Sequence, residues 1–528
     1  MDKKDKERKP KGIGWGLQLF VATLLAAAHI GLVYGRDAVT FHWPDHPEGY
    51  MYGIPVLFVL FTVFVYALFL DVIYRLYRRD RVFLSYLKYF LLYFVFIGIF
   101  WLLCWPGIFK GDEFYTINAA LDFKLSAMQS GLTSLFYICA LMFFPSMAAI
   151  CGFQLLVICS IFAVVVKERF ENGKKGRRYL VFVPFVLLPV IDADLFTLRA
   201  SLVGWLFLLF LHKLAALPEG KEENMRGLLP LTILCGLICA WRSEFIYLLL
   251  LLPLALWLWK KRTIRQALLC LLLICVFRGM FAIPNKIAEN GQNKYPISLV
   301  LNPLANLFTE AESLRGPDVY DDIMTINELV DVRLLRQNAS VRNISQYWNI
   351  EDVVPKEQLS RFMKAAIRLI VYNPEKFLKY RWQTFCYTNG FYPGYINHPG
   401  GEDVNAILSL SYYDRDYRDY FVLMDAPLGQ ALRQKVIELL ACRHYESGNI
   451  RTNALLPVFY NVLWPVLGLC VLLGVAIKRK NRDLIWKILF VGLQLVLIFL
   501  TAPAMFFMYY FCLYLNGYVL LFDAAAEG

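Results

Sequence analysis

Charged residues are scarce in this 528-residue sequence: only 18% are Asp, Glu, Lys or Arg, against about 25% in an average soluble domain. Hydrophobic residues make up 58% and aromatic residues 16%, which makes a soluble globule a poor description of the chain. The 54 Lys and Arg residues outnumber the 42 Asp and Glu residues, for a formal net charge of +12. Such an excess is typical of proteins that contact nucleic acid or a membrane surface. The hydropathy selects the membrane, and we expect no nucleic-acid partner.

The sequence also lacks the motifs of common metal and redox sites. It holds 12 cysteines but no C-x-x-C pair, and no Cys and His residues stand at the spacing of a zinc site, which excludes a structural zinc site and a thioredoxin-type site. Most of the cysteines fall in or beside apolar runs, where a thiol acts as a small hydrophobic side chain. Only Cys386 and Cys442 lie in a polar stretch, and whether they pair stays open.

Long apolar runs, in contrast, recur along almost the whole chain. A membrane-spanning helix needs about 20 predominantly apolar residues, and runs of that kind predict an all-α polytopic membrane protein with about 12 transmembrane helices. The predicted spans are 13–35, 53–73, 85–105, 147–166, 179–191, 197–212, 227–241, 245–259, 266–284, 456–477, 484–501 and 504–523.

Lys and Arg residues collect in alternate connections between these spans. By the positive-inside rule such connections are cytoplasmic, which places both termini inside. The apolar segment 131–146 would break this alternation if it crossed, so we expect it to lie in the outer interface. The first apolar run is long, so we expect a retained anchor and no cleaved signal peptide. The basic connections are the N-terminal tail, 75–81, 167–178, 260–265 and 478–482.

Four regions follow from this topology. Residues 1–84 hold the tail and two additional transmembrane helices, and residues 85–284 form a transmembrane core with a first outer loop at 105–146. Residues 285–455 are polar, contain no spanning run and form an outward-facing, mainly helical domain in which Asn373 and Pro374 signal a helix start. Residues 456–528 return to the membrane.

An acidic pair stands in the first outer loop, where W-P-G-I-F-K-G-D-E-F places Asp112 and Glu113 beside the membrane. Adjacent carboxylates repel each other, which favours the protonated form of one of them. A carboxylate in a partly dry cleft suits general-base chemistry on a hydroxyl. The alternative is an ordinary solvated loop.

Two later outer turns carry further charges. Asp192 and Asp194 spell a D-x-D at the turn between the fifth and sixth spans, with Arg199 following; an acidic turn without function is the alternative. Arg242 and Glu244 lie between two short apolar stretches. A guanidinium near membrane depth has a partner or a ligand, and it suits an anionic phosphate, whereas an Arg242–Glu244 pair that only caps the helices is equally compatible with the sequence.

A Tyr-rich stretch in the polar region admits two interpretations. Its aromatic rings and carboxylates could bind the faces and hydroxyls of sugars, but Tyr is also common in interfacial belts and cores. The stretch comprises Tyr392, Tyr395, Tyr412, Tyr413, Tyr417 and Tyr420, with Asp414, Arg415 and Asp416 between them.

Taken in order, these features resemble the polytopic membrane glycosyltransferases with the C-type fold (GT-C), in particular bacterial members of uncertain substrate. That family keeps an acidic pair in its first large outer loop, as in Gly111-Asp112-Glu113, followed by interfacial helices, as in 131–146. A later outer acidic residue matches Asp192 or Asp194. An Arg before a Leu-rich span matches Arg242-Ser243-Glu244, and an outer domain precedes the last helices. The chain lacks the Trp-His-Pro or Lys-Pro-Pro element and the final Arg-Tyr pair of many relatives, and reads Met508-Tyr509 instead.

The resemblance implies sugar transfer from a polyprenyl-phosphate donor lipid to a glycan, lipid or protein acceptor of the cell envelope, with inversion, at the outer face of the plasma membrane. Asp112, with Glu113 in support, would accept the acceptor proton. Asp192 or Asp194 would position the acceptor or a divalent cation, which is optional, and no cofactor is required. Lys110, Arg199 or Arg242 would neutralise the leaving phosphate.

Two alternatives from other classes stay open. A polysaccharide polymerase, ligase or flippase for lipid-linked glycans is also polytopic with large outer loops, but gives no reason for an acidic pair there. A transporter or scaffold is the second alternative, and the sequence shows no inverted repeat that would favour a transporter.

Overall fold

The computed structural model describes residues 15–34, 41, 43–109, 111–197, 199–220, 225–340, 350–389, 391, 411–412, 415–417, 419–446, 449–452 and 454–527. These residues are helical apart from loops and two short antiparallel hairpins. The hairpins pair β1 (Ser411–Tyr412) with β2 (Arg415–Asp416) and β3 (Arg443–Glu446) with β4 (Asn449–Thr452).

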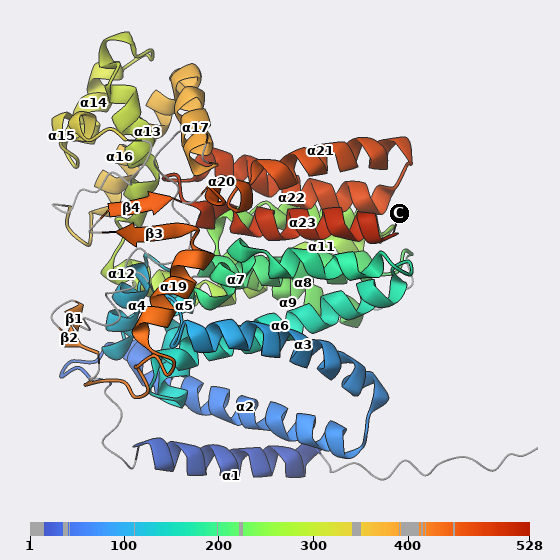
Figure 1. Cartoon of the computed structure of the whole chain (residues 1–528). Helices are drawn as coiled ribbons and strands as arrows, with labels where there is room; N and C mark the ends of the chain where they lie inside the picture. Colours follow the sequence, from blue (N-terminus) through green and yellow to red (C-terminus); the bar gives the residue numbers. More distant parts are fainter. Residues whose placement is uncertain are drawn as a thin grey trace, which may run out of the picture.

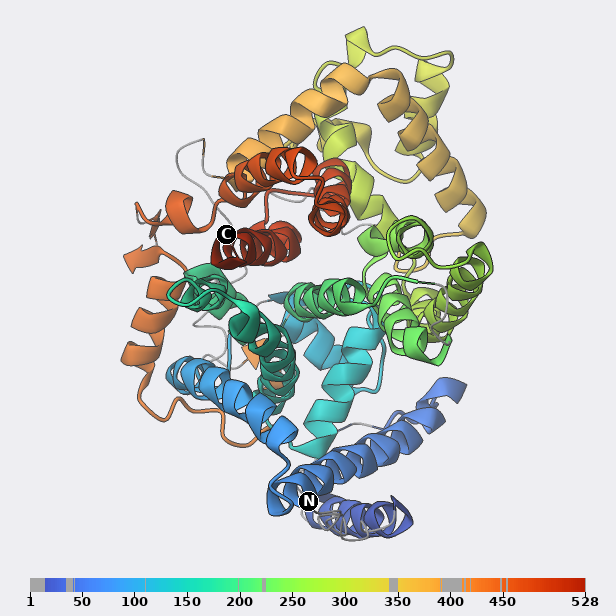
Figure 2. The same cartoon turned by 90° about the vertical axis from the view of Figure 1, so that its right-hand side faces the viewer.

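Long helices lie side by side in a bundle, and the short helices and hairpins gather at one end of it (Figure 1). We call this the domain end. The opposite end, which faces the viewer in Figure 2, carries the Lys- and Arg-rich connections, and we call it the basic end. The connections of the basic end are residues 78–80, 173–177, 259–263 and 479–481.

Eight helices in the described part of the chain are long and apolar enough to cross a membrane. In lipid only a helix satisfies every backbone group within its own segment, so the apolar runs fold as helices. The protein is therefore a helical, multi-pass membrane protein. The eight are α1 (Trp15–Tyr34), α2 (Gly53–Tyr77) with the turn η1 (Gly49–Tyr52), α3 (Arg81–Leu103), α6 (Met147–Asn172), α8 (Arg199–Ala216), α11 (Ile264–Phe281), α21 (Leu463–Lys478) with α20 (Leu456–Phe459), and α22 (Arg482–Thr501).

The other four predicted spans fold as shorter helices beside the long ones (Figure 1). Pro184 lies in the middle of the predicted span 179–191, and this span is divided into a 3-10 segment and a short α-helix. Proline removes a backbone donor and disfavours a continuous α-helix. The four are η2 (Arg178–Val186) with α7 (Leu188–Leu195), α9 (Met225–Trp241), α10 (Leu248–Leu258) and α23 (Phe511–Glu527). A total of twelve spans stays a prediction.

Two short helices at the domain end carry the first outer loop. They are α4 (Gly111–Leu121) and α5 (Gly131–Phe143). The 13 residues of α5 extend about 20 Å at 1.5 Å per residue, less than the roughly 30 Å of a hydrocarbon core. This length accords with the prediction that 131–146 does not cross.

The predicted outer domain has a hydrophobic core of its own. Leu304, Phe308, Ile326 and Phe362 are fully buried in one cluster that is separate from the core of the bundle. The cluster joins helices that are distant in sequence. The helices and turns of this region are α12 (Ile283–Gly291), α13 (Tyr295–Phe308), η4 (Ala311–Ser313), α14 (Val319–Asn327), α15 (Val332–Gln337), α16 (Lys356–Tyr372), α17 (Pro374–Thr388) and α19 (Gln430–Leu440).

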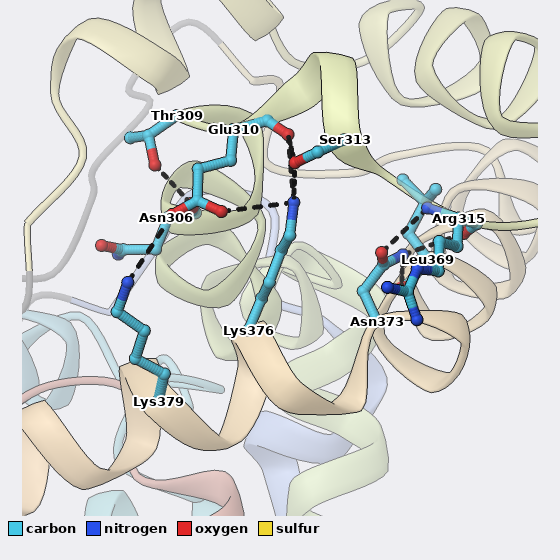
Figure 3. A network of polar contacts seen from close by, with 9 residues as sticks. All are labelled: Asn306, Thr309, Glu310, Ser313, Arg315, Leu369, Asn373, Lys376 and Lys379. Carbon is cyan, nitrogen blue, oxygen red and sulfur yellow. Dashed lines mark hydrogen bonds and ion pairs between the residues drawn. The ribbon is translucent and has the colours of Figure 1, made fainter.

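A polar network fixes α17 against the rest of this domain (Figure 3). The helix begins at Pro374 as predicted, but the Asn373 side chain makes no capping bond. Its Nδ2 donates to the carbonyls of Arg315 and Leu369 (2.9 and 2.8 Å) instead. One turn into α17, Lys376 Nζ lies 3.3 Å from Glu310 Oε2. These contacts fix the corner between α16 and α17.

The orientation of the bundle can be tested by labelling in a variant whose native cysteines are replaced. Asp321 on α14 is exposed in the domain, and Lys175 is exposed at the basic end. We expect Asp321→Cys to react with an impermeant maleimide on intact cells and Lys175→Cys to react only after permeabilisation, because basic connections stay in the cytoplasm. The opposite labelling pattern would place the acidic pair inside.

Candidate functional site

Several predicted site residues converge on one tyrosine at the domain end. Tyr509 lies in η5 (Phe507–Tyr510), the turn between α22 and α23. The charges of Asp112, Arg242 and Arg199 all act on its phenol, and so does Tyr295. Electrostatic coupling of this kind requires proximity, so the starts of α4, α8 and α13 and the end of α9 lie near this turn.

The environment of Tyr509 is partly buried and electrostatically mixed. Burial raises the pKa of its phenol well above the usual value; Tyr295 and Asp112 add to this rise, and Arg242 and Arg199 oppose it. The phenol therefore stays protonated and can donate a hydrogen bond. One acid group and two guanidinium groups thus act on a single phenol, and we call Asp112, Arg199, Arg242 and Tyr509 the polar cluster.

The two members of the acidic pair have different surroundings. Asp112 is partly buried in the first turn of α4 and accepts a hydrogen bond from Gln129 Nε2 at 3.0 Å. Glu113 is fully buried. Burial, and next the charge of Glu113, raises the pKa of Tyr137, whose hydroxyl donates to Thr197 O and Oγ1 at 3.0 Å. Asp112 is thus the more accessible carboxylate, and the helix start favours its negative charge.

The two arginines of the polar cluster, Arg199 and Arg242, have local partners. Arg199 Nη2 donates to Tyr295 Oη at 3.4 Å, a long hydrogen bond. Arg242 Nε forms an ion pair with Glu244 Oε1, with 10% and 15% of the two side chains exposed. The capping pair that the sequence left open is therefore present. The charge of Arg242 also acts on Tyr509. Arg242 therefore belongs to the polar cluster although it is paired with Glu244.

A frame of hydrogen bonds holds the start of α5 next to the turn that carries Arg242. Ser130 Oγ donates to Asn285 Oδ1 (2.7 Å), and Asn285 Nδ2 donates to Ala240 O (2.7 Å). Trp241 Nε1 donates to Thr133 Oγ1 at 2.9 Å. The frame joins α5, α9 and α12, so the turn that carries Arg242 has a fixed position. The sequence gave no sign of these pairings.

The closest approach in this frame is at Gly131. A Cβ at this position would lie 2.3 Å from the carbonyl oxygen of Pro284, which is backbone. We expect Gly131→Ala to lower the unfolding free energy by about 1–3 kcal/mol, as overpacking does, because α5 and α12 must separate. Thermal unfolding in detergent measures this loss. Gly279→Ala, which meets nothing within 4 Å on α11, should leave the melting temperature unchanged or raise it, and equal melting for both variants would contradict the close contact.

The loop that leads into α4 is clamped from two sides. Ile108 N donates to Leu195 O at 3.0 Å, at the end of α7. Arg433 of α19 is 1% exposed and donates to Trp105 O (2.9 Å) and Gly107 O (3.0 Å). Burial lowers the pKa of this arginine to about 10, so it remains charged at neutral pH. The carbonyls ahead of the acidic pair are therefore held by a cation about 330 residues further along the chain.

Asp192 and Asp194 lie in a different environment from Asp112. Both are fully buried in α7. Asp194 accepts from Tyr93 Oη at 2.6 Å and from Trp205 Nε1 at 2.7 Å, and Asp192 accepts from Tyr460 Oη at 3.2 Å. Their positions favour a structural role in helix packing.

The remaining predicted residues are placed as follows. Lys110, Tyr392, Tyr395, Tyr413 and Asp414 lie outside the described residues. Tyr417 is fully buried with its ring 5.4 Å from that of Phe114 in α4, which favours the core interpretation of this tyrosine. All 12 cysteines are free, so Cys386 and Cys442 do not pair. The described residues include no group of three His, Cys, Asp or Glu side chains suited to a metal ion.

Comparisons of the chain with protein-family models, with curated proteins and with solved structures give no match. The class that the fold defines is a helical multi-pass membrane protein.

Proposed function

We propose that this protein is a GT-C-type membrane glycosyltransferase with twelve spans, which transfers a sugar from a polyprenyl-phosphate donor to a cell-envelope acceptor at the outer face of the plasma membrane. The observation that carries the proposal is the convergence of Asp112, Arg199 and Arg242 around Tyr509. A general base near two guanidinium groups at a partly buried position suits a reaction that removes a proton from a hydroxyl and releases a phosphate.

The proposed reaction is a single displacement with inversion. The acceptor oxygen forms a bond to the anomeric carbon while the bond from this carbon to the phosphate oxygen breaks. Asp112 accepts the hydroxyl proton, and polyprenyl phosphate leaves as an anion next to Arg242 and Arg199. Tyr509, which stays protonated, can donate to either oxygen. The proposed step uses no metal ion.

Arg242 is expected to act on donor binding. Charge-assisted hydrogen bonds contribute about 1.5–3 kcal/mol, so Arg242→Ala should raise the KM for the donor about 10- to 100-fold and change kcat less. Lys286→Ala removes an exposed cation from the same end of the bundle and should leave KM unchanged. An unchanged KM in Arg242→Ala would remove this residue from the donor site.

The proposal is tested with purified protein in liposomes and a panel of radiolabelled polyprenyl-phosphate hexoses and pentoses. We expect radiolabel to move to an envelope-lipid or glycan extract and polyprenyl phosphate to appear in equal amount. Movement of intact donor between leaflets without release of polyprenyl phosphate would support the flippase alternative instead.

A further inference from the structure

A polar cavity lies at the basic end, on the side opposite the candidate site. Its volume is about 160 Å³, and it opens between α6, α8, α22 and α23, which leaves room for several water molecules or one small polar ligand. Asn516 and Asp523 line it from α23, and their spacing of seven residues places them on one helix face. Nothing in the proposed reaction uses these groups.

The charges in the cavity are of both signs. Arg169 Nε forms an ion pair with Asp523 Oδ2 at 3.0 Å, and His212 Nε2 lies 3.1 Å from Glu168 Oε2. Lys487 adds a cation and the exposed Glu527 adds an anion. Because cationic and anionic side chains both line the cavity, it is suited to a ligand that carries both charges.

The buried polar atoms that have no hydrogen-bond partner among the described residues include Asn516 Oδ1 and Arg169 Nη1, which belong to residues of the cavity lining. Asn516 is fully buried, and its Nδ2 donates to Gly204 O at 3.3 Å and Cys512 O at 2.8 Å. These two carbonyls fix the amide orientation, so its acceptor oxygen is left without a donor in a fully buried position behind the cavity wall. The groups that a ligand in the cavity can reach are therefore the charged side chains of Arg169, Lys487, Asp523 and Glu527.

We propose that this cavity binds a zwitterion with a phosphate next to a primary ammonium. The phosphate lies against Arg169 and Lys487, since guanidinium and ammonium groups bind phosphate oxygens. The ammonium donates to the carboxylates of Asp523 and Glu527, which line the same cavity. The cavity lies where the spanning helices α6 and α8 end, which is the level of lipid headgroups, so phosphatidylethanolamine of the surrounding leaflet and free phosphoethanolamine are the two sources.

The test uses full-length protein in bilayers of equal phosphatidylethanolamine, phosphatidylcholine and phosphatidylglycerol, with the retained lipid identified by native mass spectrometry. We expect about fivefold more phosphatidylethanolamine than phosphatidylcholine, because a quaternary ammonium cannot donate the hydrogen bond that is worth about 1 kcal/mol. Lys487→Gln and Glu527→Gln should each reduce this ratio. Lys213→Gln, which is exposed and does not line the cavity, should retain it.

A second arm separates the two sources. Free phosphoethanolamine is added to protein in phosphatidylglycerol bilayers, and its effect on the melting temperature is compared with that of phosphocholine. If free phosphoethanolamine raises the melting temperature but no lipid is preferred, the cavity binds the zwitterion and its ligand is the free compound. The proposal is overturned by lipid retained in the bilayer ratio without such stabilisation, by preference for phosphatidylglycerol, or by a preference that Lys487→Gln and Glu527→Gln leave unchanged.

Discussion

Asp112→Asn should lower sugar transfer by at least two orders of magnitude while the protein folds and inserts normally. The substitution keeps the shape of the side chain and can keep an acceptor oxygen for Gln129, but it removes the group that takes the acceptor proton. A general base contributes about 10²–10⁴-fold to the rate. Initial rates of transfer from a polyprenyl-phosphate donor, with the melting temperature as a check on folding, measure the effect.

The neighbouring carboxylate separates two assignments. Glu113 is fully buried, so Glu113→Gln should cost less transfer than Asp112→Asn if it only supports its neighbour, and more if the roles are exchanged. Asp321→Asn removes an exposed carboxylate from the outer domain and should leave the rate unchanged. If both Asp112→Asn and Glu113→Gln retain near wild-type turnover, the base lies elsewhere and the flippase or polymerase alternative gains support.

Asp194→Ala should destabilise the protein by about 3–5 kcal/mol, the largest structural effect that we expect from a single substitution. The change leaves the hydroxyl of Tyr93 and the indole N–H of Trp205 without their acceptor in a fully buried position. Each orphaned donor costs about 1–3 kcal/mol, and removing the carboxylate volume adds a cavity. Unfolding in mixed detergent micelles or by thermal shift measures the loss.

A matched change at the surface gives the scale for this effect. Asp71→Ala breaks an ion pair with Arg75 in which the two side chains are 38% and 46% exposed, and such pairs contribute about 0–1 kcal/mol. If Asp194→Ala folds as stably as Asp71→Ala but loses transfer, Asp194 belongs to the site and the structural interpretation is wrong.

The membrane-spanning architecture could be predicted from sequence because lipid imposes a simple rule on apolar runs. A run as long as 53–73 admits one solution in lipid, a helix, and α2 occupies it. The rule is weaker where proline interrupts a run: Pro184 divides the predicted span 179–191 into a 3-10 segment and a short helix. The mean hydropathy of residues 179–191 gives no sign of this interruption.

The site was only partly predictable, because its parts meet through tertiary packing. Asp112 and Arg242 stand out as charges beside apolar runs, whereas Tyr509, which brings them together, is an ordinary residue for a turn between spans. The D-x-D spelling of Asp192 and Asp194 carries no information about Tyr93, Trp205 or Tyr460, which bind these carboxylates from distant helices.

The clamp on the loop ahead of α4 also sets an order of events during biosynthesis. The carbonyls of Trp105 and Gly107 are bound by Arg433, which the ribosome adds only after more than three quarters of the 528 residues have been made. A nascent chain that has already inserted α3 therefore carries the loop between α3 and α4 without its cation through most of translation. The loop ahead of α4 reaches its final contacts late, when α19 packs against it. A chain terminated before α19 therefore inserts most of its spans without completing the site.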